Sequence, residues 1–108
     1  MRNTAWSELS PEGLARLGGH MGVYELGTAE GATVLIGFAG GRSRFGLRGE
    51  LERHLSEGIA GATQFRVEVT MGYWSRYKEL LMLHLHGHGH LPLANTDDPQ
   101  RLGRLSPG

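Results

Sequence analysis

The segments Gly22-Val23-Tyr24 and Leu35-Ile36-Gly37, which are separated by ten residues, decide the fold of this 108-residue chain. Each belongs to a short apolar run of the kind that forms a β-strand, and the glycine-rich residues 27–31 between them predict a turn. We therefore expect strands at residues 22–26 and 33–38, joined as an antiparallel hairpin. The second run is almost continuously apolar, which indicates a strand that is buried on both faces.

Three helices and one more strand are expected outside this hairpin. Ser10 followed by a proline predicts a helix start, because a hydroxyl caps the first free NH groups and proline suits the first helical position. Leucines spaced by four residues predict an amphipathic helix over residues 47–57. Alternation of apolar and polar side chains predicts a third strand over residues 64–71. A last helix is expected from about residue 74 to residue 86, ended by Gly87.

The order of these elements is α-β-β-α-β-α, which predicts an α+β fold. A right-handed crossover through the middle helix places the third strand beside the first. The expected sheet therefore has three antiparallel strands in the order 2-1-3, flanked by helices. We expect a single domain over residues 1–108, with its core at about 22–95 and a flexible tail at 96–108.

Composition restricts the classes of partner. Eleven Lys and Arg balance eleven Asp and Glu, so attraction to nucleic acid must come from local clusters of charge. The absence of cysteine excludes disulfides and thiolate metal sites, and fits a cytoplasmic protein. The sequence shows no signal core and no run of about 18 apolar residues, so we expect no membrane partner.

The two strand motifs and the order of elements resemble the GIY-YIG nuclease superfamily over roughly residues 22–95. Three further features strengthen the resemblance. His54 and the leucine after it match the His-hydrophobic pair of the family's helix. Glu79, followed by two leucines, matches the glutamate of the last helix, and a proline precedes Asn95 in the family's usual order.

The resemblance implies an endonuclease that hydrolyses phosphodiester bonds in nucleic acid with one divalent metal, Mg²⁺ or Mn²⁺. It assigns Glu79 as the metal ligand and Tyr24 as the general base or its assistant. It places His54 near the scissile phosphate and Asn95 among the residues that bind the nucleic acid. Mg²⁺ prefers oxygen ligands and often uses only one or two protein carboxylates, which is consistent with this assignment.

Two positions depart from the family pattern. Leu35 stands where the second motif has a tyrosine, and Glu50 stands where the family has its catalytic arginine. Arg48 lies nearly on the opposite side of the helix from Glu50. Arg42 or Arg44, from the glycine-rich loop before the helix, is therefore the better candidate to replace the missing cation. Guanidinium groups beside glycines and a helix start are suited to phosphate, so we expect all three arginines to contact phosphate.

We therefore expect a divergent, weak metal-dependent nuclease or phosphodiesterase. The alternative is a catalytically inactive module of the same fold that binds nucleic acid or a protein partner, and a homodimer is open as well. In that case Tyr24 and His54 are packing residues, Glu79 forms a surface ion pair with Arg76, and the arginine loop is merely solvated.

The last feature is a run of alternating histidines, His84, His86, His88 and His90. Such a tract can bind Zn²⁺, Ni²⁺ or Cu²⁺. Neighbours at i and i+2 on a helix diverge, and no cysteine or adjacent carboxylate completes a tight site. We therefore expect adventitious metal binding, and a function as a metal-binding module ranks third.

Overall fold

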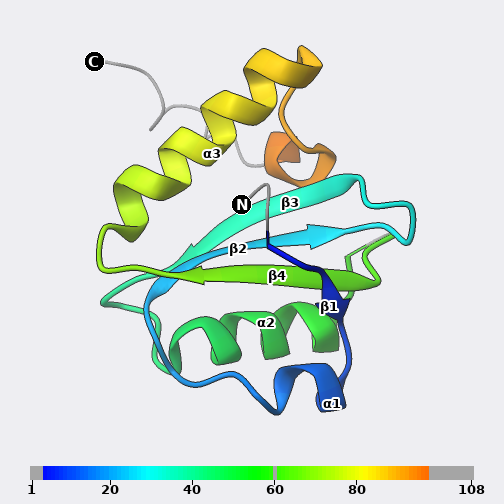
Figure 1. Cartoon of the computed structure of the whole chain (residues 1–108). Helices are drawn as coiled ribbons and strands as arrows, with labels where there is room; N and C mark the ends of the chain where they lie inside the picture. The colour runs from blue at the N-terminus through cyan, green and yellow to red at the C-terminus, as the bar shows by residue number, and fades with distance from the viewer. Residues whose placement is uncertain (1–3, 60, 98–108) are drawn as a thin grey trace.

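A computed structural model describes residues 4–59 and 61–97 and shows a four-stranded antiparallel sheet with helices on both faces (Figure 1). The strands run in the order β1-β4-β2-β3. The elements, in chain order, are β1 (Ser7–Glu8), α1 (Pro11–Leu14), β2 (Gly22–Gly27), β3 (Thr33–Ala39), α2 (Gly46–Glu57), β4 (Gln64–Val69), α3 (Tyr73–His88) and the 3-10 helix η1 (Leu93–Asp97).

The motif hairpin forms as predicted. β2 pairs antiparallel with β3, and Tyr24 lies opposite Gly37. An ideal Cβ on Gly37 would lie 2.3 Å from the Tyr24 hydroxyl oxygen, so only a glycine leaves room for the tyrosine ring at this point. The two motifs are therefore joined by one close packing contact between the tyrosine of the first and the glycine of the second.

The sheet has one strand more than the three predicted. β4 lies beside β2, as the crossover argument requires, but Ser7 and Glu8 add a fourth strand, β1, on the free edge of β4. A strand of two polar residues shows no alternation of apolar and polar side chains in the sequence, so only tertiary packing determines that it forms. The preceding Trp6 lies over Gly27, where an ideal Cβ would come within 2.5 Å of the indole, and this holds the segment against the sheet.

The sheet separates two hydrophobic cores. On the α2 face, α1 and α2 cover apolar residues of all three long strands (Figure 1). On the other face, α3 packs over β2 and β3 through Tyr77, Leu80 and Leu81, which contact Val23 and Ile36. No helix in the described part of the chain is long and apolar enough to span a membrane.

Several element ends differ from the prediction. α1 is a single turn, capped by the Ser10 hydroxyl, which accepts a hydrogen bond from the Gly13 amide at 3.0 Å. α3 does not end at Gly87 but continues to His88, because exposed glycine is tolerated in a helix while Gly89, at φ +77°, supplies the left-handed residue that ends it. The buried residues of α3 are Tyr77, Leu80 and Leu81. Of the tail predicted at 96–108, residues 96 and 97 belong to η1, and the residues from 98 onward lie outside the described part of the chain.

Candidate functional site

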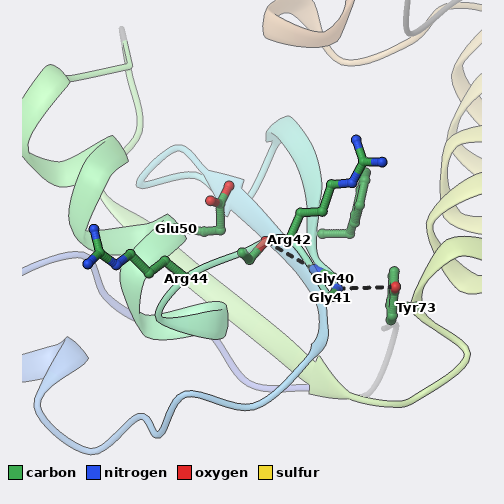
Figure 2. Close-up of a pocket in the computed structure, with 8 residues that line it drawn as sticks. Gly40, Gly41, Arg42, Arg44, Glu50 and Tyr73 are labelled. Atoms are coloured by element: carbon green, nitrogen blue, oxygen red, sulfur yellow. Dashed lines mark hydrogen bonds between the residues drawn. The ribbon is translucent and has the colours of Figure 1, made fainter.

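The loop between β3 and α2 carries the arginines that were singled out above, and local contacts hold its start in place. The Ser43 hydroxyl accepts a hydrogen bond from the Gly40 amide at 3.0 Å, and the Tyr73 hydroxyl accepts one from the Gly41 amide at 3.2 Å (Figure 2). Gly46, at φ +63°, begins α2, and its Cα lies so close to the backbone of Gly19 that a Cβ would clash. The loop is thus fixed at both ends while its arginines point outward.

A pocket of about 450 Å³ opens at this loop, where the end of β3 meets the starts of α2 and α3. Figure 2 shows Arg42 and Arg44 extending from the loop in different directions, with the Glu50 carboxylate between them. Both arginines are exposed. The pocket is lined by Phe38, Gly40, Gly41, Arg42, Ser43, Arg44, Glu50 and Tyr73.

The charges of the loop arginines are not neutralised by carboxylates in the described part of the chain. On α2, by contrast, Arg48 lies 3.7 Å from Glu52, and Arg53 lies 3.0 Å from Glu50. The pairing with Arg53 offsets the negative charge that Glu50 brings to the pocket. The pocket therefore keeps a positive character from Arg42 and Arg44.

Tyr24 and His54 do come together. The Tyr24 hydroxyl lies 2.7 Å from His54 Nε2, a hydrogen bond between a strand and α2. Tyr24 is 1% exposed and His54 is 6% exposed. His54 lies on α2, one helical turn after Glu50, and Tyr24 lies on β2 beneath this helix. This contact fits a buried polar pair that fixes α2 on the sheet, and it leaves little room for a substrate at the hydroxyl.

Glu79 does not join them. It lies on α3, on the other face of the sheet, and pairs with Arg76 one turn before it. Arg76 also binds both oxygens of Glu68 on β4, at 3.0 and 3.2 Å, and this hydrogen bonding raises the pKa of Arg76 above its ordinary value. A guanidinium therefore lies between the two carboxylates, so Glu79 is engaged in an ion pair in this structure. As they stand, no three His, Asp or Glu side chains within residues 4–59 and 61–97 are grouped to hold a metal ion.

Asn95 has a structural contact in this fold, with the backbone of β3. Its side-chain oxygen accepts a hydrogen bond from the Ile36 amide at 2.8 Å, and its NH₂ group donates one to the Ile36 carbonyl at 2.9 Å. It is 1% exposed. The amide thus replaces a neighbouring strand for one residue of the outer strand β3, and both of its polar groups are used.

The structure adds two residues that the sequence did not single out. Tyr73 anchors the arginine loop, and its ring stacks on Phe38 with 5.8 Å between centroids. Phe45 is 65% exposed and lies beside Arg44, whose guanidinium carbon is 5.6 Å from the ring centroid. An aromatic residue directly after two loop arginines was the signal available in the sequence for Phe45. For Tyr73, which is distant in the chain, the sequence holds no such signal.

These features define an α+β domain with a small basic pocket at one end of its sheet. The family described as Domain of unknown function (DUF7508) matches residues 1–87, and the chain therefore belongs to that family. No curated protein and no solved structure matches the chain.

Proposed function

We propose that this domain is a non-catalytic module that binds the phosphate backbone of nucleic acid at the arginine loop. The observation that carries the proposal is the pair of exposed guanidinium groups, Arg42 and Arg44, on a loop that is anchored at both ends and has no carboxylate partner among the described residues. A fixed arginine binds phosphate through charge-assisted, often bidentate, hydrogen bonds.

The aromatic residues at the loop favour nucleic acid over a free anion. Phe45 presents an exposed ring next to Arg44, and bases stack on such rings irrespective of their sequence. Arg48 lies in the first turn of α2, and its exposed ion pair with Glu52, at 3.7 Å, is weak enough to exchange for a phosphate. A cation beside an aromatic ring is the combination used by proteins that bind single strands.

The dispersal of the family's site residues supports a binding function over catalysis. Tyr24 and His54 are buried under α2, while Glu79 lies across the sheet in an ion-pair network. Hydrolysis by the expected mechanism needs the base, the metal ligand and the phosphate-binding cation within one cleft. The arginine pocket, by contrast, is open to a ligand of this kind.

We expect the Arg42→Ala/Arg44→Ala double variant to lose most of the affinity for labelled single-stranded DNA or RNA. The measurement is fluorescence anisotropy over a range of salt concentrations. Each phosphate contact contributes a slope of roughly 0.7–0.9 to the salt dependence, so the slope should fall by about 1–2 in the double variant.

The matched control is Arg16→Ala. Arg16 is also an exposed arginine, but it follows α1 and lines a different pocket. Its variant should bind as the wild type does. Equal losses in the control and the double variant, or wild-type binding without salt dependence, would count against the loop as the binding site.

A second candidate is weak nuclease activity, and the contact between Tyr24 and His54 favours it. Two residues to which the GIY-YIG resemblance assigns roles in the same reaction lie within 2.7 Å of each other, although they are 30 positions apart. Mg²⁺ or Mn²⁺, with Glu79 as its ligand, stays a prediction of that resemblance.

The test is single-turnover nicking of labelled duplex and single strands with Mg²⁺ or Mn²⁺. Loss of one group that stabilises the charge of the transition state typically lowers the reaction rate by about 10²–10³-fold. Glu50→Arg, which restores a cation, should therefore raise the rate if an active site exists. Tyr24→Phe should remove it. Absence of cleavage by the wild type and by Glu50→Arg would leave the binding module alone.

A further inference from the structure

The C-terminal end of α3 gathers three histidine side chains that the sequence had suggested would diverge. Because α3 runs to His88, His84 and His88 are four positions apart and lie on one face of the helix. Gly89 then turns the chain back through its left-handed conformation, and the His90 ring lies near those of His84 and His88. Their ring centroids lie 4.2 Å (84 to 88), 5.8 Å (84 to 90) and 6.1 Å (88 to 90) apart.

We propose that His84, His88 and His90 form a binding site for a divalent metal ion of the Zn²⁺ type, with water at the fourth position. Imidazole nitrogen is a preferred ligand of Zn²⁺, with Zn–N distances near 2.0–2.1 Å, and three protein ligands with one open position are typical of non-structural zinc sites. This geometry places the ring centroids of tetrahedral ligands about 5 Å apart. The three observed separations lie on both sides of that value.

The hydrogen bonds of two rings leave the nitrogen needed for a metal. His84 Nδ1 lies 2.9 Å from the His90 carbonyl oxygen, and His90 Nδ1 lies 2.9 Å from the Leu91 carbonyl oxygen. A carbonyl oxygen only accepts, so each Nδ1 carries the hydrogen and each Nε2 of the neutral ring carries the lone pair. A metal-binding histidine in proteins usually donates its other N–H in this way.

Two of the three rings, those of His84 and His88, line a pocket of about 330 Å³ together with Glu25, Arg66 and His86 among others. An ion can reach the rings from solvent, because His88 and His90 are exposed.

Binding requires the rings to turn, because as they stand no three His, Asp or Glu side chains among the described residues are grouped to hold a metal ion. In the structure His84 and His88 stack with 25° between their planes, so their ligand atoms do not yet face one centre. His88 and His90 are exposed residues, and exposed side chains change rotamer within nanoseconds. A bound ion would then join the end of α3 to the segment that leads into η1, on the face of the sheet opposite α2.

The experiment is calorimetric titration of the full chain with ZnCl₂ at pH 7.5, followed by the same titration of four single alanine variants. We expect one Zn²⁺ per wild-type chain and affinity losses of at least about tenfold for His84→Ala, His88→Ala and His90→Ala. His86→Ala is the matched control, since its exposed ring belongs to the same tract and makes no ring contact with the other three in the described structure. It should bind Zn²⁺ as the wild type does.

A second measurement keeps the result independent of small changes in folding. Histidine ring resonances in ¹H–¹⁵N correlation spectra should shift for His84, His88 and His90 on addition of Zn²⁺, while those of His86 stay in place. Similar affinity losses in all four variants, with His86 resonances shifting too, would show adventitious binding by a histidine tract and overturn the proposal. So would the lack of one-to-one binding by the wild type.

Discussion

Arg66→Met is expected to lower the free energy of unfolding by about 3–5 kcal/mol, because it would leave the buried carboxylate of Glu25 without its partner. Glu25 is 5% exposed, and one of its oxygens accepts hydrogen bonds from Arg66 Nε at 2.9 Å and Nη2 at 2.7 Å. The guanidinium also lies over the Trp6 ring, with 4.1 Å from its central carbon to the centroid. Methionine keeps the apolar stem over Trp6 and removes only the charge.

The measurement is denaturant unfolding of four chains: wild type, Arg66→Met, Glu25→Leu and the double variant. Replacing both partners of a buried pair by apolar residues is often neutral, so the double variant should be more stable than Arg66→Met alone. Arg53→Met is the matched control, because Arg53 also pairs with two carboxylates but does so on the surface, where such pairs contribute about 0–1 kcal/mol. Similar losses at positions 53 and 66 would contradict the interpretation.

Asn95→Leu is expected to lower the free energy of unfolding by about 2–5 kcal/mol. The side chain forms two hydrogen bonds to the backbone of Ile36 and is almost fully buried. Leucine would leave a buried N–H and a buried C=O unpaired, and each such group costs about 1–3 kcal/mol. Thermal and denaturant unfolding of the variant measure the loss.

Asn95→Asp is the graded comparison. A carboxylate still accepts the hydrogen bond from the Ile36 amide but cannot donate one to the Ile36 carbonyl. The free energy of unfolding of this variant should therefore lie between those of the wild type and Asn95→Leu. A leucine variant as stable as the wild type would show that Asn95 does not hold η1 on β3. Such a result would return Asn95 to the list of candidate ligand-binding residues.

The two proposed binding sites occupy different parts of the molecule and can be tested separately. The arginine loop follows β3, while the three histidines lie at the far end of α3, so substitutions at one should leave the other unchanged. The family match ends at residue 87, within the histidine tract. The arginine loop lies wholly inside the matched region.

Local patterns in the sequence were sufficient for the central part of the fold. The apolar runs around Tyr24 and Ile36 predicted the hairpin, and the handedness of the crossover predicted that β4 lies beside β2. The leucine spacing predicted α2 to within one residue. These features depend on the spacing of apolar residues and on the order of the elements along the chain, and both can be read from a single sequence.

The candidate site depended on contacts that the sequence does not carry. The contact between Tyr24 and His54, their burial, and the pairing of Glu79 with Arg76 arise from how α2 and α3 pack on opposite faces of the sheet. β1 exists only because Ser7 and Glu8 meet the open edge of β4. A two-residue strand has no period of its own, so its pairing is decided by the edge that receives it.

The histidine tract shows the same division most clearly. Alternating histidines were read from the sequence, and spacing alone indicated that neighbours on a helix diverge. The tertiary structure moved the helix end from Gly87 to His88 and turned His90 back through Gly89. The sequence therefore determined that this end of the chain has imidazole side chains, which can bind a metal ion. The position of one left-handed glycine, whose missing Cβ allows the turn, decided which three rings lie together.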